Sequence, residues 1–207
     1  MDIKTLVQEK QKVNLHCIIS AVLNLLVATF QIVSMLLSSV KYCYFSWGLL
    51  SAYTEDSGIQ DLTGYSSSYN HIESTMCGSY KPIIQAACSD FCANVELFHK
   101  AGIAMMVFQL LTVFLNLAYV CLHLLAYKNR VPRSDLLYYG IWLPPFVFTV
   151  GVCLYISIGN IYGVNDTWKS EQDLKTGPGL TLAISVMILN FLPAIHSYIF
   201  TSARITN

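Results

Sequence analysis

Four long apolar runs of the chain contain no Asp, Glu, Lys or Arg, and more polar segments separate them. A helix crosses a hydrocarbon core of about 30 Å with roughly 20 residues, because each residue adds about 1.5 Å. Every run is longer than that, so the pattern predicts four transmembrane helices. They cover residues 13–40, 101–127, 136–162 and 177–203. Two larger connections remain, the long loop at about residues 41–100 and the short loop at about residues 163–176.

Basic side chains at the ends of the runs indicate the orientation, because Lys and Arg beside membrane spans favour the cytosolic side. We expect both termini and the link between the second and third helices to be cytosolic, and both loops to lie outside, at the plasma membrane. Asn165 begins an Asn-x-Thr sequence in the short loop, which predicts a glycosylation site there. The basic residues are Lys4, Lys10, Lys12, Lys128, Arg130, Arg133 and Arg204.

Composition agrees with a membrane protein. The chain is 55% hydrophobic and 12% charged, whereas soluble domains are about 25% charged. Its 12 basic and 12 acidic residues balance, so no net field favours nucleic acid as a partner.

Four of the seven cysteines, Cys43, Cys77, Cys88 and Cys92, lie on the long loop. An even number of cysteines in an oxidising compartment indicates two disulfides, for which three pairings are possible. We expect a helix over residues 82–100, which places Cys88 and Cys92 one turn apart, where disulfide geometry is poorly met. Two pairings remain. Cys43 leaves the first helix at the membrane surface and Cys92 is the loop cysteine closest to the second helix, so we favour Cys77 with Cys88 and Cys43 with Cys92, and the connectivity stays open.

The long loop begins with an aromatic-rich stretch, Tyr42 to Tyr53, whose partly alternating pattern is typical of a strand beside an aromatic belt. Gly58, Gly64 and the Ser66-Ser67-Ser68 run are expected as turns between further short strands. The simpler interpretation is an interface belt followed by a disordered loop. The expected disulfides favour a small folded cap.

Short motifs along the chain carry a resemblance to the claudin-like tetraspan superfamily. This superfamily includes claudins, epithelial membrane proteins, calcium-channel gamma subunits and glutamate-receptor auxiliary subunits. Gly48-Leu49-Leu50 is similar to the family's Gly-Leu-Trp, and Cys77 with Cys88 is similar to its cysteine pair. "HKAGIAMMVFQLL" and "GPGLTLAISVMILNF" are similar in texture to the family's second and fourth helices.

The resemblance implies a small antiparallel sheet, formed by the long loop, over a left-handed four-helix bundle. Trp47, Gly48, Leu49 and Leu50 would form a corner of this cap that rests on the bundle and contacts partners. We therefore predict one all-α membrane domain over residues 1–207, a four-transmembrane-helix bundle with a small disulfide-tied extracellular β cap.

Polar and small side chains inside the spans are expected to pack the helices together. Interhelical hydrogen bonds from such residues contribute about 0.6–2 kcal/mol each, and small residues permit close contact. Two adjacent prolines, Pro144 and Pro145, are expected to kink the third helix. The helix-packing residues are Asn24, Asn116, Asn190, Gly177, Gly179 and Ala183.

His16, His123 and His196 fall near the predicted cytosolic ends of the first, second and fourth helices. Facing histidines in a helix bundle can hold a haem iron axially. Contact with interfacial water is the simpler interpretation. We therefore expect no cofactor and no metal, and haem at these three histidines is the alternative.

The sequence contains no Cys-x-x-Cys, Gly-rich phosphate loop, His-Glu-x-x-His or Gly-x-Ser-x-Gly motif. We therefore do not expect an enzyme. We expect an auxiliary or scaffold subunit of a larger membrane complex, such as an ion channel. Its partners would be the lipid bilayer and other membrane proteins, contacted through its helices and long loop. Two alternatives are a junctional adhesion or barrier protein and a haem-binding electron-transfer subunit.

Overall fold

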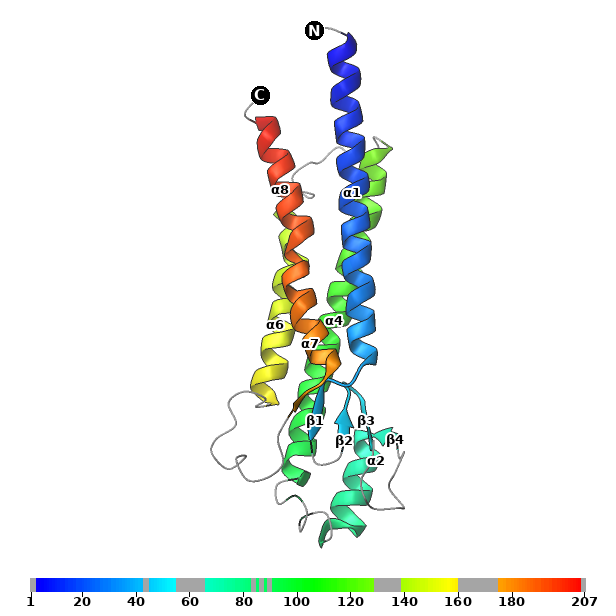
Figure 1. Cartoon of the computed structure of the whole chain (residues 1–207), viewed down its shortest axis with the longest axis vertical. Coiled ribbons are helices and arrows are strands. Elements are labelled where there is room, and N and C mark those ends of the chain that lie inside the picture. The colour runs from blue at the N-terminus through cyan, green and yellow to red at the C-terminus, as the bar shows by residue number, and fades with distance from the viewer. Residues whose placement is uncertain are drawn as a thin grey trace. The chain divides into compact units, whose positions relative to one another are not determined.

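The computed structural model describes residues 3–42, 45–54, 66–82, 85, 88, 91–128, 139–159 and 175–205. Within them, four helical segments are long and apolar enough to cross a membrane, as the sequence predicted. Figure 1 shows their order, α1, α4, α6 and the pair α7 and α8. Cys43, Gly58, Gly64 and Asn165 lie outside the described residues. The bounds are Ile3–Leu36 for α1, Phe91–Tyr127 for α4, Leu143–Ile158 for α6, Pro178–Leu189 for α7 and Phe191–Ile205 for α8.

Helix α4 begins at Phe91, before the start of the predicted span. The prediction missed its first turns because they are polar, and the span was predicted from an apolar run. Lys100 Nζ lies 2.6 Å from Glu96 Oε1, an exposed i,i+4 pair that supports helical structure there. Cys88 precedes the helix and is not helical itself. The prediction of a continuous helix over residues 82–100 is therefore wrong.

Pro144 and Pro145 occupy the first turn of α6, directly after the 3₁₀ turn η3, Gly140–Trp142. The N–H groups of a first turn have no acceptor within the helix, so proline is tolerated there. The hydroxyl of Thr149 donates to the carbonyl of Pro145 at 2.7 Å. The predicted kink within the third helix is wrong, because the helix begins at these prolines.

The fourth helical segment is the one that is interrupted. Helix α7 ends at Leu189 and α8 begins at Phe191, with Asn190 between them. Pro193 follows, and a proline cannot donate to the carbonyl four residues earlier, which belongs to Leu189. The missing hydrogen bond accounts for a break at this place.

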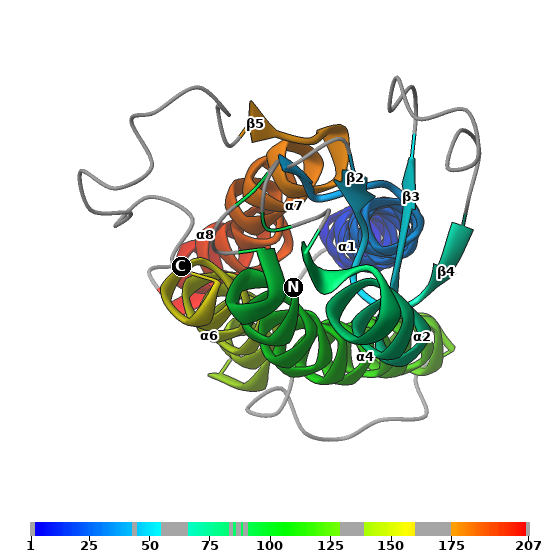
Figure 2. The same ribbon diagram turned by 90° about the horizontal axis from the view of Figure 1, so that it is seen from below.

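Both loops contribute to one antiparallel sheet with strand order β4-β3-β2-β1-β5. Val40 of β1 pairs with Thr176 of β5, so the short loop supplies an edge strand (Figure 2). At the other edge, Ser51 of β3 pairs with Ser68 of β4. Ser66 to Ser68 is therefore a strand rather than the predicted turn, because backbone pairing with β3 overrides its turn-like composition. The bounds are Val40–Tyr42 for β1, Phe45–Trp47 for β2, Ser51–Thr54 for β3, Ser66–Ser68 for β4 and Lys175–Thr176 for β5.

A short helical region that the sequence did not predict follows β4. It consists of the α-helix α2, Tyr69–Ser74, and the π-helical turn η2, Thr75–Ser79. Tyr69, Ile72 and Met76 recur at helical spacing and are all buried. This one-sided burial fixes the helical region on the rest of the cap.

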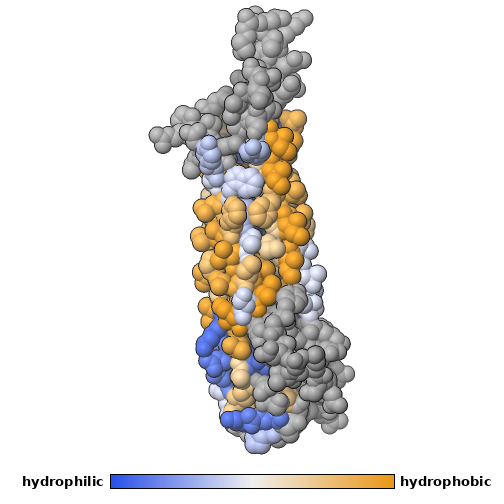
Figure 3. Space-filling model, turned by 90° about the vertical axis from the view of Figure 1, so that its left-hand side faces the viewer, coloured by the Kyte–Doolittle hydropathy of each residue, from blue (hydrophilic) through white to orange (hydrophobic). Residues whose placement is uncertain are grey.

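The chain forms two units. The histidine unit comprises residues 1–31, 110–149 and 185–207, and the sheet unit comprises residues 32–109 and 150–184. Large apolar side chains are exposed along the helices of each unit, among them Phe114 in the first and Val107 in the second. Figure 3 shows this hydrophobic surface in orange on the face in view. Such a surface suits contact with lipid or with other membrane helices.

Candidate functional site

The histidine unit has a polar interior beneath its apolar surface. Polar side chains on α1 recur four and seven residues apart, which places them on one helix face. In a hydrocarbon environment such groups must find partners within the protein. The buried polar residues are Ser20, Asn24 and Gln31 on α1, Thr112, Asn116 and His123 on α4, Asn190 between α7 and α8, and Ser197 on α8.

Three amides in this interior join α1, α4 and the break between α7 and α8. Asn116 Nδ2 on α4 donates to Gln31 Oε1 on α1 at 3.2 Å and to Asn190 Oδ1 at 3.3 Å. Asn24, in contrast, donates to the Ser20 carbonyl of its own helix at 2.8 Å. All three predicted packing asparagines are buried. Gln31 was not predicted as a packing residue, although it lies seven residues after Asn24 and therefore on the same helix face.

We expect Asn116→Ala to lower the free energy of unfolding by about 1–2 kcal/mol, because it removes hydrogen bonds to two other helices. Denaturant unfolding in detergent micelles measures the loss. Asn24→Ala is the matched control, and its effect should be smaller because its hydrogen bond stays within α1. Equal losses in the two variants would contradict the role of the amide network.

Three histidines converge in the same unit. The rings of His16 and His196 are stacked, with centroids 4.7 Å apart and planes 23° apart. The ring of His123 lies edge-on to His16 at 6.1 Å. Axial haem ligands point ring nitrogens at the iron from opposite sides, whereas the stacked pair present their ring faces to each other. His16 and His196 as placed do not fit an axial haem pair.

An aromatic cluster forms the interior of the sheet unit. Trp47 of β2, fully buried, lies 5.3 Å from Phe45, 5.5 Å from Tyr69, 5.8 Å from Phe91 and 5.7 Å from Phe98, measured between ring centroids. Aromatic pairs at such separations add to the stabilisation from burial. The cluster holds the sheet, α2 and the first turns of α4 together.

Tyr69 has a polar contact as well as an aromatic one. Its hydroxyl donates to the Gly48 carbonyl at 2.8 Å, and its ring stacks on His99 at 5.1 Å. Burial, with a smaller effect from Tyr155, raises the pKa of Tyr69 well above its usual value. The hydroxyl therefore remains protonated at physiological pH and continues to donate to the β2–β3 turn.

The Trp47-Gly48-Leu49-Leu50 corner rests on α4. Trp47 and Leu49 are buried, and the Leu49 carbonyl occupies the place where Gly102 would carry a Cβ. Leu50 is 49% exposed. Of the two leucines predicted to contact a partner, only Leu50 offers its side chain to one.

Glycines also permit close contact between α7 and the end of α1. The N–H groups of Gly177 and Gly179 donate to the carbonyls of Ser39 and Ser38, each at 2.8 Å. A Cβ on Gly179 would lie 2.6 Å from the carbonyl oxygen of Leu37. Gly177, Gly179 and the buried Ala183 were predicted to pack helices together. All three lie in the sheet unit.

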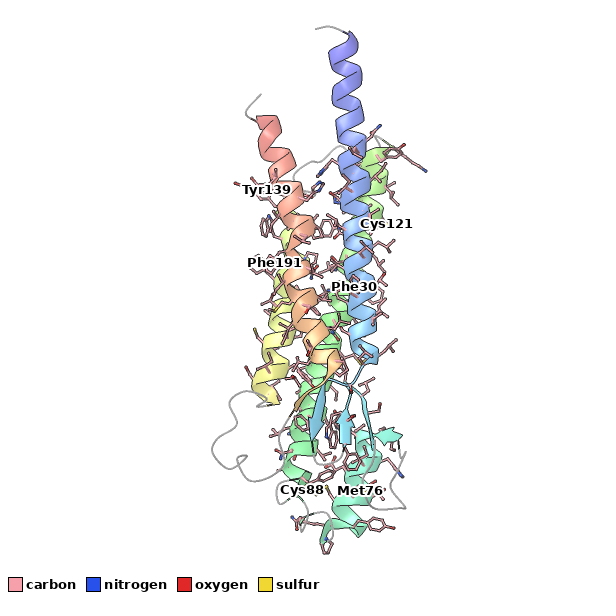
Figure 4. The ribbon with its side chains drawn as sticks, viewed as in Figure 1. Phe30, Met76, Cys88, Cys121, Tyr139 and Phe191 are labelled. Atoms are coloured by element: carbon pink, nitrogen blue, oxygen red, sulfur yellow. A yellow bond between two sulfur atoms is a disulfide. The ribbon has the colours of Figure 1, made fainter. Side chains whose placement is uncertain are left out.

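One disulfide of the cap joins Cys77 in η2 to Cys92 in the first turn of α4, with Cα atoms 5.6 Å apart. The favoured pairing of Cys77 with Cys88 and of Cys43 with Cys92 is therefore wrong. It paired Cys92 with Cys43 because Cys92 is the loop cysteine closest along the chain to the second span, whereas the fold brings Cys77 of η2 to the first turn of α4. Cys88 is also disulfide-bonded, and Figure 4 places it and Met76 at the end of the sheet unit that carries α2.

Mass spectrometry of non-reduced peptides is expected to find Cys77 linked to Cys92. A Cys77–Cys88 peptide from native protein would contradict this arrangement. The free thiols are those of Cys17, Cys121 and Cys153.

Comparison of the chain with protein-family models and with curated proteins finds no match. Among the residues that the structure describes, no group of three or more His, Cys, Asp or Glu side chains is arranged to hold a metal ion. The features with functional potential are therefore the anchored cap with its exposed Leu50 and the polar interior with its histidines.

Proposed function

We propose that the chain is a non-catalytic, claudin-like tetraspan protein that acts as an auxiliary or scaffold subunit of a larger membrane complex, such as an ion channel. It lies in the plasma membrane with both termini in the cytosol, as the basic residues beside its spans favour. It binds its partner laterally, through its cap and the exposed faces of its helices.

The observation that carries this proposal is the anchoring of the cap. Strands from both loops form one sheet, and the Leu49 carbonyl fits against Gly102 of α4. The Cys77–Cys92 disulfide adds a covalent link between η2 and α4. A cap held in this way is preorganised, and preorganised surfaces lose less conformational entropy when a partner binds.

The helices support the same proposal from within each unit. Their exposed faces are apolar, whereas the amides of Gln31, Asn116 and Asn190 bond to one another inside the histidine unit. Polar groups engaged in this way favour helix packing over the lining of a water-filled pore. Lateral association then depends on apolar faces and on the exposed edge of the cap.

Photo-crosslinking from position 50 tests the partner contact. Leu50, exposed beside the buried corner, is replaced by a photoreactive amino acid and the chain is irradiated in its native membrane. We expect adducts with one larger membrane protein. The matched control carries the same group at Tyr80, which is 51% exposed on the turn after η2. Adducts with lipid alone would count against the proposal, and adducts with a second copy of the chain would favour the adhesion alternative.

A further inference from the structure

Buried polar side chains of the histidine unit repeat at an interval of seven residues. Seven residues are about two helical turns, so side chains at this interval lie on one helix face, about 10 Å apart along the axis. Each residue of the amide network has a buried polar counterpart at this interval, and these counterparts form a second polar layer. The counterparts of Gln31, Asn116 and Asn190 are Asn24, His123 and Ser197.

Hydrogen bonds and ring contacts place this second layer among the histidines. Asn24 Nδ2 donates to the Ser20 carbonyl at 2.8 Å, and Ser20 Oγ lies 3.1 Å from His196 Nδ1. The His196 ring stacks on His16, whose ring centroid lies 6.1 Å from that of His123. A short chain of contacts therefore links Asn24 on α1 to His123 on α4.

Polar atoms of this layer have unmet hydrogen-bonding capacity. Asn24 Oδ1 and both ring nitrogens of His123 have no hydrogen-bond partner among the described residues. Turning the Asn24 amide over would not help, because it would point Oδ1 at the Ser20 carbonyl. Each of the two side chains is 1% exposed, and a buried polar group left unpaired costs about 1–3 kcal/mol. A ligand that paired with these atoms would therefore be stabilised here.

The chemistry of the atoms limits what that ligand is. Asn24 Oδ1 only accepts hydrogen bonds, whereas a neutral imidazole has one donor and one acceptor nitrogen. Among the side chains that the structure describes in this unit there is no Asp or Glu, so a cation would lack a counter-charge. Water both donates and accepts, and a buried water typically makes about three hydrogen bonds. The side chains one turn from Asn24 and Ser197, Ala21 and Ala194, are small.

We propose that the histidine unit binds a water molecule between Asn24 and His123. The water donates to Asn24 Oδ1 and forms a second hydrogen bond with the His123 ring. The Ser197 hydroxyl, which can donate or accept, is the third group that the layer offers. The bound water joins α1, α4 and α8 at this level, as the amides of the first layer join their segments directly.

Solid-state NMR of the full chain in lipid bilayers, with magnetisation transferred from water protons to side-chain carbons, tests the proposal. We expect the signals of Asn24 and His123 to build up several-fold faster than that of Ala28, which is equally buried on α1 at 1% exposure. The exposed His71 on α2 marks the rate for full hydration. Build-up at Asn24 and His123 as slow as at Ala28 would overturn the proposal.

His123→Phe tests whether His123 holds the water, because it removes both ring nitrogens and keeps an aromatic ring. We expect the build-up at Asn24 to fall to the rate of Ala28, whereas His123→Gln, which retains a donor and an acceptor, should preserve it. His71→Phe is the matched control and should leave Asn24 unchanged. Fast build-up at Asn24 in folded His123→Phe would contradict the proposed site. The measurement on the unaltered chain decides the question if the variants do not fold.

Discussion

Trp47→Ala is expected to lower the free energy of unfolding by about 3–5 kcal/mol, the typical cost of replacing a fully buried Trp or Phe with alanine. Trp47 is 0% exposed and makes four aromatic contacts that join β2 to α2 and α4. Its removal leaves a cavity at the place where the sheet meets the helices. Thermal or denaturant unfolding in a mild detergent measures the effect.

Leu50→Ala is the matched control for this loss. Leu50 belongs to the same corner but is half-exposed, so its truncation should change stability by no more than about 0.5 kcal/mol. The two variants together separate the interior of the cap from its contact surface. Similar losses for both would contradict the description of Trp47 as the centre of the cap.

Gly102→Ala is expected to destabilise the protein by about 1–3 kcal/mol, the usual range for overpacking. Alanine in the interior of an unobstructed helix is normally more stable than glycine by about 1 kcal/mol. The added Cβ at position 102, however, meets the Leu49 carbonyl, which is backbone and cannot rotate away. The sign of the effect therefore tests whether the corner is seated on α4.

Gly78→Ala provides the control, because no heavy atom lies within 4 Å of a Cβ added at Gly78. Its unfolding transition should stay close to that of the unaltered chain. A Gly102→Ala variant that is as stable as the control, or more stable, would show that the corner does not rest on α4.

The helical spans could be predicted because an uncharged run of sufficient length is a local property of the sequence. Their ends were less certain, since the polar first turns of α4 carry no hydrophobic signal. The break at Asn190 also escaped prediction, although Pro193 was visible. The predicted kink was assigned to Pro144 and Pro145. These prolines lie in the first turn of α6, where proline is tolerated, so they do not interrupt that helix.

The sheet depended on pairing between distant segments, which a local pattern does not encode. Ser66 to Ser68 is turn-like in composition, and its extended form depends on its pairing with β3. β5 has two residues and no signal of its own. The disulfide prediction failed for a related reason. It paired Cys92 with Cys43 by their positions along the chain, whereas the placement of η2 beside the first turn of α4 brings Cys77 to Cys92.

For the candidate sites too, individual residues could be predicted from the local sequence, whereas contacts between distant segments could not. The histidines and asparagines stood out individually because polar residues are rare in membrane spans. Gln31 as a partner of Asn116, and the stacking of His16 on His196, depend on how helices face one another. The burial of Trp47 likewise required the fold, and it reversed the expectation that this residue offers a contact surface.

Purification of the full chain from its native membrane in mild detergent tests the proposed role most directly. The composition and mass of the purified particle are measured, and the isolated chain is reconstituted alone for a flux assay. The proposal predicts a particle that contains another membrane protein in fixed ratio, and no ion flux from the chain by itself. Recovery of the chain as a solitary monomer that conducts ions after reconstitution would contradict it.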